Sequence, residues 1–215
     1  MCFSAEASFG AGTFMSIAGI VLVKKFYNTL FILIALSPLF FGIQQLSEGI
    51  IWKGLTHHQF FEPFTQTAMY VYLFFAYMFW PVWWPLAFGL AEKTLWRQIV
   101  MGGCFLIGLL FFFMCGYDLL VHGNQPPRIV GHSIDYGPNH LRNRIIYGII
   151  TILPLILSTI PKMWILGIVF LFTFIAAEIS YHYAFTSIWC FVCAIATVGF
   201  FIFLKNPPKI NQELL

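Results

Sequence analysis

The side chains in this sequence that could do chemistry lie mostly inside apolar segments. Glu48 follows Gln44 and Gln45 in a stretch that is otherwise largely apolar. Helical residues three and four apart share a face, so both amides neighbour the carboxyl group, and Trp52 continues that face by one turn. Carboxyl groups at membrane depth are costly and usually serve a function. This face is therefore a candidate for binding or catalysis.

Two further carboxylates each precede a histidine by four residues, as Asp118 with His122 and Glu178 with His182. Oxygen and imidazole groups at this spacing are candidate metal ligands. In a hydrolase, Glu48 or Glu178 would act as the base and a histidine as ligand or acid. The alternative is that these groups form the interhelical hydrogen bonds and ion pairs that hold a bundle together in lipid.

A pair of cysteines, Cys190 and Cys193, has the spacing of a redox pair. The segment resembles the Cys-x-x-Cys of the vitamin K epoxide reductase class, which implies thiol and quinone chemistry. That class has fewer helices and a second cysteine pair on the outer side, where this chain offers only Cys2. The alternative is that both thiols pack as small apolar side chains.

The composition identifies the solvent around these residues. Of the 215 residues, 60% are hydrophobic and only 9% are charged, whereas soluble domains carry about 25% charged residues. So few charges cannot cover a water-facing surface, which predicts an all-α integral membrane protein with the lipid bilayer as its main partner. A net charge of +3 without a block of like charges gives no indication of nucleic acid.

Seven apolar segments predict about seven transmembrane helices in a single domain, residues 1–215. The fifth is short unless it begins nearer Leu141, and Pro154 interrupts it. The alternative is that the fifth does not span, which leaves six crossings and inverts the last two helices. The segments are Ala5–Val23, Leu30–Trp52, Ala68–Leu90, Ile99–Val121, Ile145–Ser158, Ile165–Tyr183 and Ile188–Leu204.

The distribution of Lys and Arg predicts an outer N-terminus and a cytoplasmic C-terminus. In that orientation seven cations are cytoplasmic: Lys24, Lys25, Lys93, Arg97, Lys162, Lys205 and Lys209. Four are outside: Lys53, Arg128, Arg142 and Arg144. The long loop at residues 122–144 is then an outer loop, and the turn residues around Arg128–Val130 and Ser133–Tyr136 predict a short hairpin within it.

Other residue types predict how the helices pack. Trp80, Trp83 and Trp84 lie where an interfacial aromatic belt is expected, with prolines that should kink their helix. Gly102, Gly103 and Gly108 should allow close helix approach.

The opening Met1-Cys2-Phe3-Ser4 resembles an uncharacterised family of bacterial multi-pass membrane proteins that begin with these residues. The resemblance extends to the segment 38–48 and to the segment 187–191, and so reaches across the whole chain. It implies a multi-helix membrane fold and brings no activity with it. The motif positions it marks include Cys2, Ser4, Gln44, Gln45, Glu48, Trp189 and Cys190.

These positions all fall in the outer half of the predicted bundle, which favours a polar pocket open to the outside. Its candidate residues are Cys2, Ser4, Glu6, Gln44, Gln45, Glu48, Asp118, His122, Glu178, His182, Trp189 and Cys190. We expect the pocket to bind or translocate a small molecule or lipid without turnover. The intramembrane hydrolase is the first alternative and the thiol oxidoreductase the second, and the residues identify no cofactor.

Overall fold

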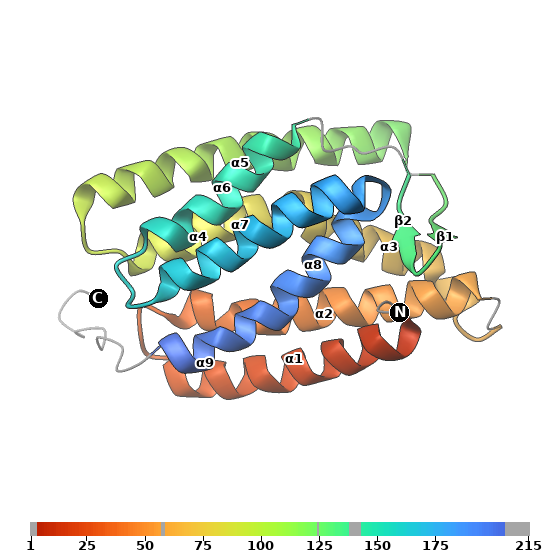
Figure 1. Cartoon of the computed structure of the whole chain (residues 1–215), viewed down its shortest axis with the longest axis horizontal. Coiled ribbons are helices and arrows are strands. Elements are labelled where there is room, and N and C mark those ends of the chain that lie inside the picture. Colours follow the sequence, from red (N-terminus) through yellow and green to blue (C-terminus); the bar gives the residue numbers. More distant parts are fainter. Residues whose placement is uncertain (1–3, 57–58, 124, 138–142, 205–215) are drawn as a thin grey trace.

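The computed structural model describes residues 4–56, 59–123, 125–137 and 143–204. This part of the chain forms a helical bundle with one short β-hairpin (Figure 1). The main elements are α1 (Ala5–Phe26), α2 (Ile32–Leu55), α3 (Thr65–Leu73), α4 (Trp80–Ala91), α5 (Leu95–His122), β1 (Arg128–Val130), β2 (Ser133–Asp135), α6 (Arg144–Leu157), α7 (Met163–Ser180), α8 (Phe185–Ala196) and α9 (Phe200–Phe203).

Short 3-10 and π segments join some of these elements, so that the seven predicted apolar segments each correspond to one helical segment of the described chain. The 3-10 turn Glu62–Phe64, α3, the π-helix Phe74–Phe79 and α4 form the third. The last consists of the 3-10 turn His182–Ala184, α8, the 3-10 turn Thr197–Gly199 and α9. Six segments are long and apolar enough to cross a membrane, whereas α6 has only 14 residues.

Successive segments run in alternating directions along the bundle (Figure 1). The start of α1, the end of α2, the hairpin and the turn between α7 and α8 lie toward one end, on the right of the view. The loops after α1, α4 and α6 lie at the other end. Much of the exterior is apolar, notably along α5, where Leu106, Leu110, Phe113 and Leu120 are exposed.

The third segment differs from its predicted bounds because it begins at Glu62 rather than Ala68. Pro63 stands in the first turn, where its missing N–H costs no helical hydrogen bond. Pro81 lies further along the same segment, just after the π-helix Phe74–Phe79. A proline cannot donate to the preceding turn, and a π-bulge is one way a helix absorbs that loss. The π-helix is thus the irregularity that the structure shows beside Pro81, and the kink itself stays a prediction.

The expected aromatic belt is wrong for two of its three tryptophans. Trp80 and Trp84 are each only 2% exposed. Trp80 stacks on Phe41 with ring centroids 3.9 Å apart, so the pair joins α4 to α2 inside the bundle. The large apolar ring area outweighs the preference of an indole for the membrane interface once its N–H has a buried acceptor.

Small residues bring particular helices into close contact. A Cβ added to Gly19 of α1 would lie 2.5 Å from the backbone nitrogen of Leu39 in α2, and one added to Gly108 of α5 would meet the carbonyl oxygen of Pro81 in α4. Gly102 and Gly103 have no atom near their would-be Cβ positions. The expectation of close approach is thus confirmed for Gly108 and wrong for the other two, whose added Cβ would meet open space.

Candidate functional site

The carboxyl group of Glu48 forms the centre of a buried polar cluster. Glu48 is 1% exposed, and its Oε1 accepts a 2.5 Å hydrogen bond from the hydroxyl of Ser187 and a 3.3 Å bond from that of Tyr136. Its other oxygen, Oε2, has no hydrogen-bond partner in the described structure. Three elements distant in sequence therefore meet at one carboxyl group.

Tyrosines cover this carboxyl group on the side of the hairpin. Tyr136 stacks on Tyr72 of α3, with ring centroids 4.7 Å apart and planes 13° from parallel. The hydroxyl of Tyr72 donates to the carbonyl of Thr186 at 3.1 Å, and the hydroxyl of Tyr77 lies 3.3 Å from that of Thr186. Burial and the nearby carboxylate of Glu48 raise the pKa of Tyr136 well above its usual value, so its phenol remains a hydrogen-bond donor.

The two glutamines beside Glu48 behave differently. Gln44 accepts a 2.8 Å hydrogen bond from the indole N–H of Trp80, but its Nε2 has no partner. Gln45 lies within interaction range of Glu48, yet neither end of its amide makes a hydrogen bond of good geometry in the described residues. Both glutamines are 0% exposed. Buried amides are normally paired, and these three amide atoms make no hydrogen bond within the described residues.

Local features of the chain explain how the cluster is assembled. Gln44, Gln45 and Glu48 share a face of α2 through their spacing. Ser187 lies in the first turn of α8. Tyr136 follows β2, where the Gly137 N–H donates 2.9 Å to Oδ1 of Asp135 and Gly137 takes a φ of +85° that favours glycine. This turn directs the tyrosine inward.

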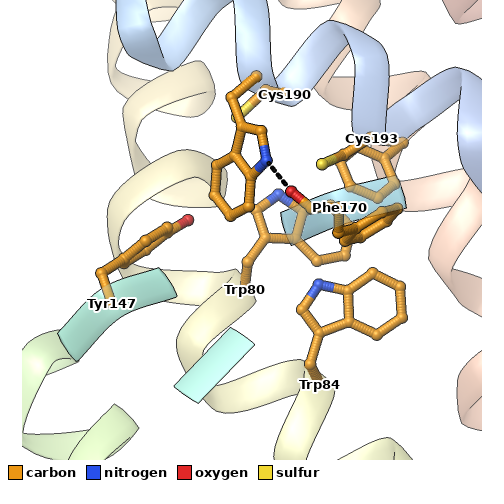
Figure 2. Close-up of a pocket in the computed structure, with 8 residues that line it drawn as sticks. Trp80, Trp84, Tyr147, Phe170, Cys190 and Cys193 are labelled. Atoms are coloured by element: carbon orange, nitrogen blue, oxygen red, sulfur yellow. Dashed lines mark hydrogen bonds between the residues drawn. The ribbon is translucent and has the colours of Figure 1, made fainter. Parts of the chain in front are cut away.

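Next to the cluster lies a small aromatic cavity of about 10 Å³, which is roughly the minimum for one water molecule. Figure 2 shows Trp80, Trp84 and Tyr147 around it, with Cys190 and Cys193 on α8 above. A dashed line marks the 3.3 Å hydrogen bond from the Trp189 indole to the carbonyl of Phe170. Trp189 and Cys190, both predicted site residues, thus belong to the wall of this cavity.

The cysteine pair is fully enclosed by this aromatic surface. Cys190 and Cys193 are both free thiols and each is 3% exposed. Cys190 shares the cavity wall with Trp80, whose indole donates to Gln44 in the Glu48 cluster. Cys2, the proposed third thiol, lies outside the described residues.

Glu178 and His182 belong to a separate cluster centred on Arg144. One guanidinium nitrogen of Arg144 lies 2.6 Å from Oε2 of Glu178 and 3.0 Å from Nδ1 of His182, which is itself 2.8 Å from Oε1 of Glu178. The expectation that both residues lie on one helix is wrong, because α7 ends at Ser180 and His182 begins a 3-10 turn. Tyr181 leaves the helix with a φ of −139°.

The Arg144 cluster adjoins the Glu48 cluster at the start of α8 and where the 3-10 turn His182–Ala184 packs against β2. Arg144 lies over the ring of Phe185, two residues before Ser187. The side chain of Glu178 is 32% exposed and that of His182 is 71% exposed, so these groups occupy the margin of the bundle. The described residues bring no third His, Cys, Asp or Glu into metal-binding distance of the pair.

Asp118 and His122 lie apart from both clusters, on α5. Nδ1 of His122 lies 3.7 Å from Oδ1 of Asp118. Asp118 also lines an apolar groove between α5 and α6 with a volume of about 270 Å³. At the N-terminus, the hydroxyl of Ser4 accepts from the N–H of Ala7 as a helix cap. Glu6 pairs with Lys53 at 2.6 Å, joining the start of α1 to the end of α2.

The structure thus brings Gln44, Gln45 and Glu48 together and leaves the other predicted acids elsewhere. The tyrosines and Ser187 were missing from the predicted site. Tyr136 in particular stands at the end of a predicted strand in the outer loop, and the hydrophobic Ile134, two residues earlier on the same face, is the sequence feature that indicates an inward-facing side. Sequence spacing gives no signal for a contact that spans 88 residues.

Over residues 1–213 the chain matches the model of a family described as a family of unknown function, DUF6629. Neither the curated proteins nor the solved structures contain a significant match to it.

Proposed function

Because the chain belongs to DUF6629, a family without an assigned activity, we propose its function from geometry: it is a multi-pass membrane protein that binds or translocates a small molecule at the buried cluster around Glu48. The proposal places the N-terminus outside and the C-terminus in the cytoplasm. The cluster then lies in the outer half of the bundle, beneath the hairpin.

The membrane assignment is supported by the six long apolar helices and by the apolar exterior of α5. With seven crossings, the loops after α1, α4 and α6 lie at one end of the bundle (Figure 1). That end has five described cations, Lys24, Lys25, Lys93, Arg97 and Lys162, against three at the other, Lys53, Arg128 and Arg144, which supports an assignment of the first end to the cytoplasm. The 14 residues of α6 cover about 21 Å, which is short of a full bilayer core.

The orientation predicts which surface positions a membrane-impermeant thiol reagent reaches in intact cells. In a Cys2→Ser background, a cysteine in place of His132 should be labelled and one in place of Lys93 should not. Both side chains are exposed, whereas the four described native cysteines are buried and add little background. Labelling of the Lys93 position alone would reverse the orientation and move the site to the cytoplasmic half.

One observation carries the binding proposal: a buried carboxyl group and two buried amides retain hydrogen-bonding atoms that the described protein does not use. Leaving such atoms unpaired costs about 1–3 kcal/mol each. A bound polar solute would recover this free energy. A cluster that served only to join helices would be expected to pair its own groups, as the Arg144 cluster does.

The proposed route from the outside to the site passes through the hairpin, which covers the cluster. In β2, Ser133 and Ile134 are buried, as is Tyr136 just beyond it, while all of β1 is exposed. The hairpin therefore covers the Glu48 cluster with one strand and faces the surroundings with the other. Displacement of Tyr136 would uncover the Glu48 carboxyl group.

The proposal is tested by thermal unfolding of the purified protein with a panel of small solutes: sodium chloride, ethylamine, glycine, glucose and laurate. At least one should raise the melting temperature of the wild type by several degrees, because a ligand that binds only the folded state stabilises it. Glu48→Gln, which keeps size but removes charge, should lose that response. Glu62→Gln is the matched control, since Glu62 is an exposed carboxylate at the same end of the bundle.

Two outcomes contradict the proposal. One is a panel in which no solute stabilises the wild type. The other is an equal response in the wild type and in Glu48→Gln, which would assign the binding to another part of the protein.

A further inference from the structure

We propose that the Glu48 cluster is a binding site for a small monovalent cation of the Na⁺ class. This inference rests on the proposed function and specifies the chemistry of its ligand. It follows from the charge of the cluster, the kind of atoms left without partners, and the tightness of the surrounding packing.

The charge argument concerns the single carboxyl group. The ion pairs formed by residues 4–56, 59–123, 125–137 and 143–204 involve other carboxylates, namely Glu6, Asp118, Asp135 and Glu178, and none includes Glu48. A carboxylate buried to 1% exposure without a counter-charge is strongly unfavourable. Either a proton or a cation must neutralise it, and one monovalent ion does so with no charge left over. A divalent ion would leave one uncompensated positive charge.

Two of the four unpartnered atoms in the cluster are oxygens suited to such an ion, and the other two are the amide nitrogens of Gln44 and Gln45. Oε2 of Glu48 and Oε1 of Gln45 both lack hydrogen-bond partners, and the two residues share one face of α2. The hydroxyl of Ser187, only 2.5 Å from the other carboxylate oxygen, supplies a third oxygen. Hard cations bind to carboxylate, carbonyl and hydroxyl oxygens, and coupling ions in membrane transporters use such groups within the bundle.

The packing limits the size of the ligand. Gln45 and Ser187 are 0% exposed, and the stacked rings of Tyr72 and Tyr136 close the cluster toward the hairpin. The neighbouring aromatic cavity, at about 10 Å³, has space for one water at most. A dehydrated Na⁺ ion is smaller than a water molecule, whereas an organic ammonium would require the cluster to open.

The test compares sodium chloride with choline chloride at equal ionic strength in thermal unfolding of the full chain. Sodium should raise the melting temperature of the wild type saturably, by about 5 °C or more when the ion is present at many times its dissociation constant. Glu48→Gln should show no difference between the two salts. Ser187→Ala, which keeps the carboxylate, should need about tenfold more sodium for the same shift, and Glu62→Gln should behave as the wild type.

Binding of radioactive sodium to the wild-type protein gives a second measurement that does not depend on a variant folding. One ion per chain, displaced by excess unlabelled sodium but not by choline, is expected. Equal melting temperatures in both salts, or no saturable sodium binding, would overturn the cation site and leave a proton as the neutralising charge. If glycine, glucose or laurate stabilises the wild type through Glu48 while sodium does not, the cation inference fails and the proposed function stands.

Discussion

Replacement of Gly108 by alanine is expected to destabilise the folded protein by about 2–3 kcal/mol, the cost of overpacking a tight contact. The new Cβ would meet the backbone carbonyl of Pro81, which cannot move aside as a side chain could. Because α4 and α5 would have to separate there, the stacked Trp80 next to Pro81 would also be disturbed. Unfolding in mixed detergent micelles, followed by tryptophan fluorescence, measures the change.

Gly103→Ala provides a control within the same helix. A Cβ at Gly103 meets no atom within 4 Å, so this change should be neutral or stabilise by up to about 1 kcal/mol through helix propensity. The contrast between the two variants separates the close approach at Gly108 from any general effect of glycine in α5. Equal stabilities for Gly103→Ala and Gly108→Ala would show that the α4–α5 contact does not depend on the missing side chain.

Composition and periodicity were enough to predict the helical segments, because length and apolarity are local properties of the chain. The same holds for the existence of the hairpin, which the turn residues predicted. The structure adds its register, with Arg128 opposite Asp135 and Gly131 in the turn at a φ of +61°. The face shared by Gln44, Gln45 and Glu48 also follows from helical spacing alone. Each of these features depends on residues that are close together in the sequence.

The partners of Glu48 could not be predicted in the same way. Ser187 and Tyr136 reach it from 139 and 88 residues away, and no spacing rule relates positions at such separations. Topology placed Glu178 at the same end of the bundle, but did not determine that Arg144 would engage it instead. Which polar groups meet depends on how the helices rotate, and that is fixed by packing at sites such as Gly19 and Gly108.

Glu92 is not among the residues singled out from the sequence. The structure shows its role at the end of the bundle opposite the hairpin. Oε1 of Glu92 accepts from the N–H groups of Lys93 and Thr94 and from the hydroxyl of Thr159, while Oε2 accepts from the Thr159 N–H at 2.9 Å. One carboxylate therefore joins the loop after α4 to the loop after α6.

This arrangement predicts that Glu92→Gln destabilises the protein by about 3 kcal/mol near neutral pH. The amide replaces one acceptor by a donor, so an NH₂ group must face either the Thr159 N–H or the N–H groups of Lys93 and Thr94. Buried donors left unpaired cost about 1–3 kcal/mol each, and bonds to a charged acceptor are stronger than those to an amide. Glu62→Gln, at an exposed carboxylate, should change stability little.

The effect should also depend on pH in a defined direction. Burial alone would raise the pKa of Glu92, but the donors from Thr159, Lys93 and Thr94 outweigh it and lower the pKa below its ordinary value of 4.5. A folded-state pKa below the unfolded one contributes stability above the unfolded value, and this stability is lost as the pH falls through the folded value. The wild type should therefore weaken below about pH 4.5, and its advantage over Glu92→Gln should shrink as the carboxylate becomes protonated. An advantage of the same size at pH values on both sides of that window would mean that the charge of Glu92 does not stabilise the junction between the two loops.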